Sequence, residues 1–208
     1  AVRLVLPAII VWEHFRKAEE VAELEANALA DLYRDAQVCP AEFRRQAEDR
    51  MRDYARLVVE EEWPAMAVGQ SGPQTWAAYN QLWQTYQAFQ PQDDHQRTWY
   101  AESIQRLNLL GDQRRNRLLS THAGVPAVMW AVLIGAGAVT VAFSFLFGTR
   151  DPRAHAAMIA ALALTIGVVL LSIVALEHPF AGITRVDPEA FQQVREIMTQ
   201  PANAGKRQ

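Results

Sequence analysis

Two long apolar runs in the last third of the chain constrain its fold more than any other feature. They cover residues 125–148 and 154–176, which are 24 and 23 residues, and neither contains Lys, Arg, Asp or Glu. About 20 apolar residues in a helix cross the ~30 Å hydrocarbon core of a bilayer. Neither run shows the polar stripe of a soluble helix. The sequence therefore predicts a transmembrane helical hairpin over residues 124–178, in an integral membrane protein.

The first 12 residues are also apolar, but they are too few to span a bilayer. They lack the charged beginning and the small-residue cleavage site of a complete signal peptide. We predict that residues 1–12 are an N-terminal membrane segment, the end of a transmembrane helix whose beginning is truncated. The alternative is the start of an interfacial helix.

Residues 13–123 are predicted to form a water-exposed domain, because most acidic residues lie before Gly124. Only five follow it: Asp151, Glu177, Asp187, Glu189 and Glu196. Apolar residues recur here at three- and four-residue steps, which predicts amphipathic helices. The first helix has an apolar seam of Val11, Phe15, Ala18, Val21, Leu24, Ala28 and Leu32, continues from the first membrane segment, and ends between residues 35 and 40.

Three more helices are expected in this domain. Residues 43–58 form a helix that stops before Pro64, and residues 66–72 form a loop. The next helix begins after a capping box of Ser71 and Gln74 and carries an aromatic stripe. Asp93 and Asp94 suit the start of the last one. Residues 179–208 are a C-terminal tail. The predicted fold is therefore all-α. The aromatic stripe contains Trp76, Tyr79, Trp83 and Tyr86.

Topology can be predicted from the Lys and Arg residues near the ends of the spans. Eight lie on the side of the domain, and Arg3, Arg150 and Arg153 lie on the other side. The count favours a cytoplasmic domain and C-terminus. The eight are Arg16, Lys17, Arg106, Arg114, Arg115, Arg117, Arg185 and Arg195.

Three histidines lie at the ends of the predicted spans on the same side of the membrane: His14, His122 and His178. With Glu13 and Glu177 beside two of them, they are candidates for a transition-metal site or a proton-sensitive gate. No His-x-x-x-His spacing supports a metal, so its identity stays unknown. The simpler interpretation is that polar residues at helix ends face lipid headgroups.

Arg114, Arg115 and Arg117 form a basic cluster before the hairpin. This cluster could attract anionic lipid, line the vestibule of an anion pathway, or anchor the cytoplasmic side. Within the hairpin, small residues predict close helix packing. The hydroxyl groups there could line a narrow pore, although Ser and Thr usually bond back to their own helix. The hydroxyls belong to Thr140, Ser144, Thr165 and Ser172, and the small residues are Ala131, Gly135, Ala138, Ala157, Ala161 and Gly167.

Several function classes find no support in the sequence. There is no phosphate-binding glycine loop, nucleophile elbow or paired Asp-x-Asp, so we expect neither an enzyme nor a bound cofactor. A net charge of −3 argues against nucleic acid as a partner. Cys39 is the only cysteine, which excludes an intrachain disulfide.

Three stretches of the sequence resemble a bacterial membrane-protein family of unknown function that is often labelled bestrophin-like. They are residues 25–34, with the ending Tyr33-Arg34; residues 114–119, followed by residues 126–130; and residues 179–182. The likeness covers nearly the whole chain, although the family has a fuller N-terminal membrane segment. The motif positions singled out are Glu25, Asn27, Tyr33, Arg34, Arg114, Arg115, Arg117, Pro179, Phe180 and Gly182.

The resemblance implies a homo-oligomeric, anion-conducting channel with cytosolic helical extensions. The sequence has no Asp-x-Asp-x-Asp-Gly loop for calcium. Within the first motif, Glu25 and Asn27 interrupt an apolar seam, and Tyr33 and Arg34 are expected to pair with the arginines at 114–117. That arrangement fits either an ion pathway or, as we favour, a salt-bridge network that fixes helix register.

Two functions remain open from the sequence. The first is a homo-oligomeric anion channel in a bacterial inner membrane, with a pathway flanked by Arg114 and Arg117. The second is a non-conducting accessory or scaffold subunit whose hairpin packs against a larger membrane complex. The expected partners are the lipid bilayer and either further copies of the chain or that complex.

Overall fold

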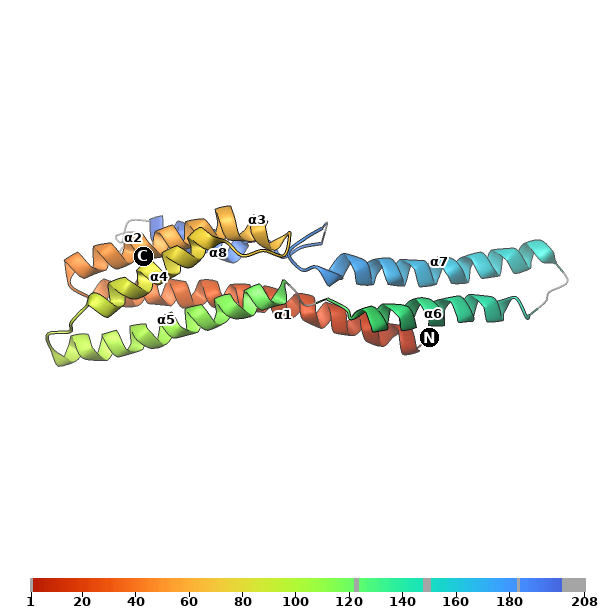
Figure 1. Cartoon of the computed structure of the whole chain (residues 1–208), viewed down its shortest axis with the longest axis horizontal. Coiled ribbons are helices and arrows are strands. Elements are labelled where there is room, and N and C mark those ends of the chain that lie inside the picture. The colour runs from red at the N-terminus through yellow and green to blue at the C-terminus, as the bar shows by residue number, and fades with distance from the viewer. Residues whose placement is uncertain (1, 122–123, 148–150, 183, 200–208) are drawn as a thin grey trace, which may run out of the picture. The chain divides into compact units, whose positions relative to one another are not determined.

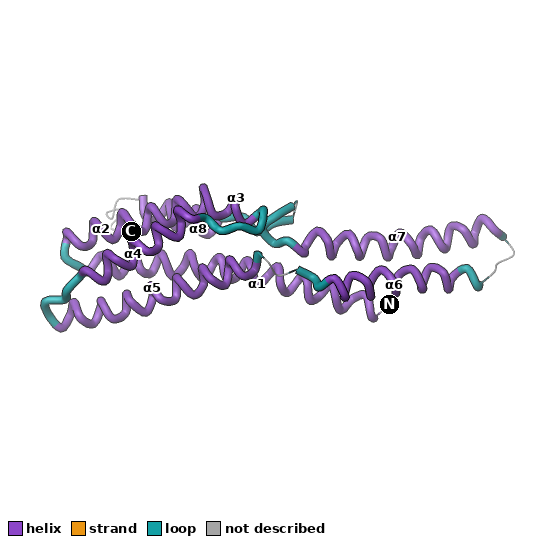
Figure 2. Tube along the Cα trace, viewed as in Figure 1, coloured by secondary structure: helices purple, strands orange, loops and turns teal. Residues whose placement is uncertain are grey.

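A computed structural model of the chain describes residues 2–121, 124–147, 151–182 and 184–199. In these ranges the regular structure is helical and contains no strand (Figure 2). The chain divides into two units. The first contains residues 1–16 and 123–185, and the second contains residues 17–122 and 186–208. The prediction of an all-α protein is confirmed.

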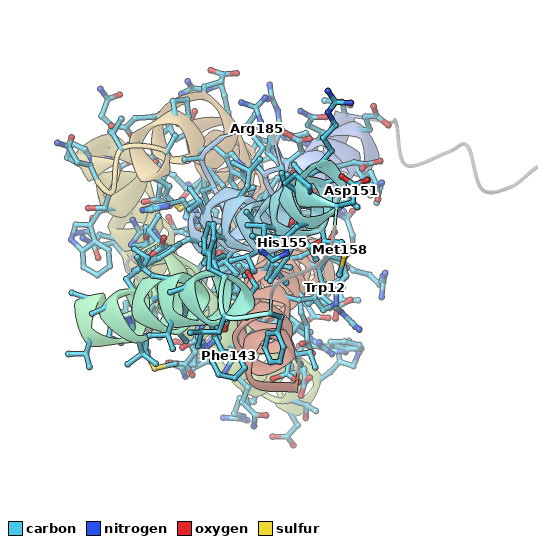
Figure 3. All side chains as sticks on the ribbon, turned by 90° about the vertical axis from the view of Figure 1, so that its right-hand side faces the viewer. Trp12, Phe143, Asp151, His155, Met158 and Arg185 are labelled. Carbon is cyan, nitrogen blue, oxygen red and sulfur yellow. The ribbon has the colours of Figure 1, made fainter. Side chains whose placement is uncertain are left out.

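Two apolar helices dominate the first unit, α6 (Ala127–Ser144) and α7 (Pro152–Glu177). At ~1.5 Å per residue they are about 27 and 39 Å long. Their length and composition qualify both as membrane spans. Their large side chains are mostly uncovered, as for Phe143 (57% exposed) and Met158 (64% exposed), both labelled in Figure 3. Apolar surface of this extent on two paired helices suits a surrounding of lipid.

The helices of the first unit pack through a small apolar cluster of Val11, Leu133 and Ile173. Val11 comes from α1 (Val2–Asp35), so the N-terminal segment contacts both apolar helices. The close approach of α6 to α7 occurs at Gly137, where an added Cβ would lie 3.1 Å from Ile166. Gly135 and Gly167, which the sequence suggested for this contact, have no such neighbour in the chain. That part of the packing prediction is wrong, because neither glycine lies on the face where α6 meets α7.

The four hydroxyl groups within α6 and α7 bond to carbonyl oxygens of their own helix. Thr140 donates to Ala136 at 2.7 Å, and Ser172 donates to Val168 at 2.9 Å. Ser144 and Thr165 donate in the same way to the third or fourth residue before them. The hydroxyls therefore find their hydrogen-bond acceptors within their own helices, as the sequence suggested.

The second unit is an antiparallel bundle. The rest of α1 and the short η1 (Ala36–Val38) lead into α2 (Ala41–Leu57), which continues through η2 (Val58–Glu62) and α3 (Trp63–Met66). The chain then forms α4 (Pro73–Ala88) and α5 (Asp94–Ser120). Asp93 caps α5 by accepting from the N–H of Gln96, as predicted. In Figure 1, α5 runs beside α1, and α4 lies against α2.

The apolar seam of α1 is buried as predicted, except at one position. Ala18 and Leu32 are fully buried, whereas Leu24 is 42% exposed. Its neighbour Glu25 is buried instead. A charged residue replaces the expected leucine in the interior because it has partners of opposite charge there.

The predicted end of the second helix before Pro64 is wrong. The chain stays helical through Pro64 because η2 is a wide π turn and Pro64 then falls in the first turn of α3, where its missing N–H is not needed. After α3, Gln70 N–H bonds to Ala65 O and Gly69 N–H bonds to Met66 O. This is a Schellman ending, and Gly69 has the positive φ of +71° that it requires.

The predicted capping box at the start of α4 is also wrong. Gly72 is the N-cap residue, and glycine has no side-chain oxygen to accept from the first N–H groups of α4. Glu61 supplies that oxygen from η2 by accepting from the N–H groups of Gln74 and Thr75. Glu61, from an earlier helix, therefore caps α4 in place of the local pair Ser71 and Gln74 that the sequence indicated.

An additional helix, α8 (Glu189–Thr199), lies within the segment that the sequence predicted to be a tail. Its residues Phe191, Val194 and Met198 are buried against the bundle. Met198 O accepts from Arg52 Nε at 3.1 Å, and Arg195 pairs with Glu60. The C-terminal segment is therefore part of the second unit. Residues 200–208 lie outside the described residues.

Candidate functional site: a buried ion cluster

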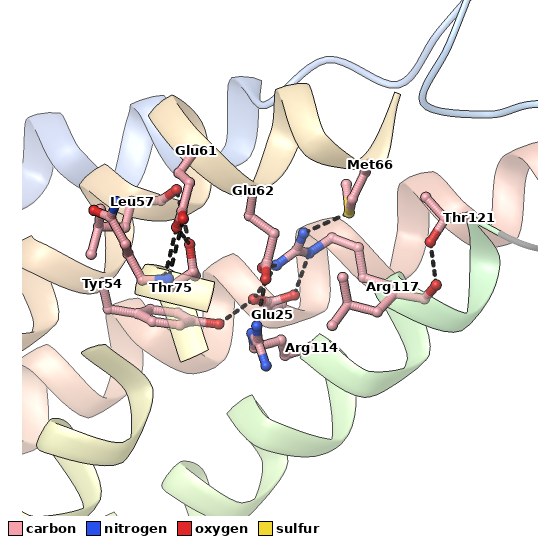
Figure 4. Close-up of polar contacts among 12 residues, drawn as sticks. Glu25, Tyr54, Leu57, Glu61, Glu62, Met66, Thr75, Arg114, Arg117 and Thr121 are labelled. Atoms are coloured by element: carbon pink, nitrogen blue, oxygen red, sulfur yellow. Dashed lines mark hydrogen bonds and ion pairs between the residues drawn. The ribbon is translucent and has the colours of Figure 1, made fainter. Parts of the chain in front are cut away.

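Four charged side chains meet inside the second unit (Figure 4). Arg117 binds Glu25 with two nitrogens, Nε to Oε2 at 2.6 Å and Nη2 to Oε1 at 3.0 Å. Its Nη2 also donates to Glu62 at 2.7 Å. Arg114 donates to the other oxygen of Glu62. The cluster therefore joins α1, η2 and α5 through charge-assisted hydrogen bonds, which are the strong kind.

Aromatic rings surround this cluster, and its charged side chains are buried. The Arg117 guanidinium lies 5.2 Å from the ring centre of Trp63 and 5.8 Å from that of Phe191. Arg114 lies 5.1 Å from the ring centre of Trp76. Cations over aromatic faces are stabilised, and more so where water is excluded. The rings therefore support both arginines while closing them off from solvent.

Tyr54 completes the cluster by donating to Glu25 at 2.5 Å. Burial, together with the negative charge of Glu25, raises the pKa of Tyr54 well above its ordinary value. Burial alone would lower the pKa of Arg117, but the charge of Glu25 and its hydrogen bonds raise it on balance. Tyr54 therefore stays a donor, and Arg117 stays charged, at any physiological pH.

Formal charges in the cluster cancel, since two carboxylates face two guanidiniums. Arg114 and Arg117 are 3% and 0% exposed, so neither presents its charge to solvent within this chain. The arrangement fixes the register of three helices, which is the interpretation that the sequence favoured. A role for these two arginines beside an ion pathway stays a prediction.

A second set of ion pairs links α1 to α5 further along the bundle. Arg106 contacts Asp31 at 2.7 Å and Asp35 at 3.3 Å. Burial raises the pKa of Asp35, although the charge of Arg106 opposes this shift. Since Arg117 pairs with Glu25 and Arg106 with residues further along α1, the two helices are antiparallel.

The other residues of the first two motifs lie away from the cluster. Asn27 is exposed. Arg34 pairs with Asp31 on its own helix, and Tyr33 donates to Met198 O and accepts from Arg52. Neither Tyr33 nor Arg34 contacts the arginines at 114–117, so that predicted pairing is wrong. Arg115 points to solvent and pairs with Asp112.

The third motif forms the turn after α7. Pro179 and Phe180 are buried, and Ala181 N–H bonds to His178 O at 3.0 Å. Gly182 has a φ of +88°, a conformation that favours glycine. The third motif therefore matches the residues that the turn after α7 requires, above all the glycine at its positive φ.

The three candidate histidines do not form a metal centre in the part of the chain that is described. His14 and His178 are exposed, and His122 lies outside the described residues. No group of three or more His, Cys, Asp or Glu with metal-binding geometry occurs among the described residues. Glu177 instead accepts from Val125 N–H at 3.0 Å and from the indole of Trp130 at 3.3 Å.

Glu62 is the cluster residue that the sequence did not reveal. It ends a run of three glutamates, which resembles a solvated helix end, but it is fully buried. Glu62 is the last residue of the π turn η2, which directs its side chain inward, and a wide turn has no simple residue signature. Charge balance could have indicated that Glu62 is buried. Two buried arginines with Glu25 alone would leave one charge uncompensated, so a second carboxylate is needed.

Glu61 lies next to the cluster residue Glu62 in the chain. We expect its carboxylate to make a pH-dependent contribution to the stability of the fold. Burial opposes the shift, but bonds from Thr75 and Gln74 lower the pKa of Glu61. A lowered carboxyl pKa contributes stability above the unfolded value, near 4.5, that is lost as pH falls through the folded value. We expect Glu61→Gln to cost about 0.5 kcal/mol at pH 7 and less at pH 3, measured by circular dichroism melts. Glu60→Gln is the control, and an equal cost of Glu61→Gln at both pH values would contradict this role.

The fold thus defines a class: a helical protein with an apolar hairpin and a separate helical bundle. The sequence model of the Bestrophin-like domain family matches residues 1–191. The chain belongs to this family, which confirms the resemblance seen in the sequence. Comparisons with curated proteins and with solved structures found no match. Family and apolar helices together make it a membrane protein, anion-channel-like at the level of the family.

Proposed function

We propose that this chain is a subunit of a homo-oligomeric channel that conducts anions across a membrane. Membership of the Bestrophin-like family is the observation that carries the proposal. A pathway through one chain has no support, because the hairpin hydroxyls bond to their own helices and the buried arginines are paired. The pathway is therefore formed between copies.

The open glycines of the hairpin supply surfaces for such an assembly. Gly135 and Gly167 have no neighbour within 4 Å of an added Cβ, so both are free for contacts outside the chain. Small residues on membrane helices allow close approach of a second helix. The proposed location is the inner membrane of a bacterium, with the bundle in the cytoplasm as the Lys and Arg count favours. We assign the chain no catalytic role and no nucleic-acid partner.

The channel is tested with the full chain in liposomes. Chloride flux is followed by quenching of an enclosed fluorophore, and mass in detergent by light scattering. We expect an oligomeric mass and a flux above that of empty liposomes. Gly135→Leu or Gly167→Leu should lower both together, whereas Val139→Leu, at a 69% exposed position, should change neither. A monomeric mass without flux would contradict the proposal.

The paired charges and self-bonded hydroxyls favour one other function, a non-conducting subunit of a larger membrane complex. It would explain why the interior of the bundle is neutral and closed. The same preparation distinguishes the two. A stable complex with a different membrane protein, recovered in stoichiometric amount and without flux, supports the accessory role.

A further inference from the structure

An open pocket lies in the second unit, between the loop that follows α3 and the last turn of α5. Its volume is about 680 Å³. The residues of the ion cluster do not line it. Its lining is Gly69, Gln70, Ser71, Arg115, Leu118, Leu119 and Thr121.

The loop wall of the pocket is held in place by backbone bonds. The Schellman ending of α3 uses the N–H groups of Gly69 and Gln70, and it fixes where the chain turns. The side chains of Gln70 and Ser71 then lie at the pocket. This wall supplies neutral polar groups on a fixed backbone.

The helix wall combines one cation with two leucines. Arg115, Leu118 and Leu119 are spaced by three and four residues, so they share a face of α5. Leu119 is 70% exposed, so its side chain is open to a ligand in the pocket. Arg115 pairs with Asp112 on its own helix, and both side chains are more than half exposed. Such a pair is weak, so Arg115 can turn to another anion at little cost.

We propose that this pocket binds the headgroup of an anionic phospholipid. The phosphate meets Arg115, whose planar guanidinium matches phosphate oxygens, and the acyl chain follows Leu118 and Leu119. Ser71 adds a hydroxyl that can donate to the phosphate. Thr121 bonds to Leu118 O through its N–H and its hydroxyl, which offsets part of the negative end of α5. A ligand with both a phosphate and a hydrocarbon chain satisfies both kinds of wall.

Along the sequence, one wall of this pocket lies close to the first apolar helix. Arg115 precedes Ala127, the first residue of α6, by 12 residues. Basic residues this close to a span act on anionic headgroups, each worth about 1 kcal/mol. The proposal requires a chain in a membrane, but it does not depend on conduction. Loss of lipid binding and loss of flux are therefore separate results.

Binding is measured by native mass spectrometry of the full chain in neutral detergent. Dioleoylphosphatidylglycerol is the probe, and dioleoylphosphatidylcholine is the comparison. We expect Arg115→Gln to weaken phosphatidylglycerol binding about fivefold, the equivalent of ~1 kcal/mol. The matched control is Arg97→Gln. Arg97 lies on the same helix, pairs with Asp94 three residues before it and is 63% exposed, against 61% for Arg115.

Two further arms separate lipid from free phosphate. Leu119→Ser should weaken phosphatidylglycerol binding, and glycerol 1-phosphate should not displace the lipid at equal concentration. Displacement by glycerol phosphate would show a site for a soluble phosphate and overturn the proposal. Equal losses for the Arg115 and Arg97 variants would overturn it too, as would equal binding of phosphatidylcholine.

Discussion

Replacing Arg117 by Met is expected to destabilise the helical bundle by about 3–5 kcal/mol. The side chain keeps its approximate length but loses its charge. Glu25 then has no cation, and Glu62 retains only Arg114. A buried carboxylate without a partner must be protonated or solvated, and either change costs folding free energy. We expect the melting temperature of the full chain in detergent to fall by more than about 10 °C, measured by circular dichroism.

The control for this prediction is Arg115→Met, two residues away on the exposed side of α5. Its loss should stay within about 0.5 kcal/mol because its ion pair is on the surface. If Arg117→Met yields no folded protein, Glu25→Gln is a milder change by which the contribution of the same cluster to stability can be measured. Glutamine keeps the shape and an acceptor for Tyr54 but removes one charge. Equal and small shifts for Arg115→Met and Arg117→Met would show that the cluster contributes nothing to stability.

Replacing Phe191 by Ala is expected to release α8 from the bundle. Phe191 is fully buried, with its ring centre 6.0 Å from that of Trp63. Truncating a buried Phe to Ala costs about 3–5 kcal/mol. A helix of 11 residues has little stability of its own, so this loss is concentrated in α8. We expect trypsin to cleave after Arg195 at least tenfold faster, since a ~1.4 kcal/mol change already gives tenfold more of the open form.

The matched control on the same helix is Ile197→Ala, at a position that is 54% exposed. It removes apolar atoms from α8 without removing a buried contact, so the cleavage rate should stay close to that of the unchanged chain. Mass spectrometry of the fragments identifies the cut. An unchanged rate in Phe191→Ala would mean that α8 is held by its polar contacts to Arg52 and Glu60 rather than by its buried ring.

Periodic patterns predicted the helices of this chain well. Phe43, Ala47, Met51 and Tyr54 are all buried on α2, as their spacing indicated. The apolar runs gave α6 and α7 to within a few residues. These predictions succeeded because helix periodicity is a local property that a short window of sequence contains.

The candidate site was harder to predict because its partners are distant in the chain. Glu25 and Arg117 were singled out, but no local pattern shows that 92 residues of separation end in a contact. The exposure of Leu24 and the burial of Glu62 depend on the same tertiary pairing. For α8 a local signal was present, since Phe191, Val194 and Met198 follow helical spacing, but a helix this short after Pro188 resembles a tail.

The wide turn η2 has a consequence for how this family can vary. A π turn contains one residue more than an α-helix needs to reach the same point. If the segment kept all its residues but took α geometry, the next part of the helix would be rotated by about 100°. Glu62 would then leave Arg114 and Arg117, and Glu61 would leave the start of α4. Relatives that keep this charge cluster are therefore expected either to retain the wide turn between Tyr54 and Trp63 or to lose one residue together with it.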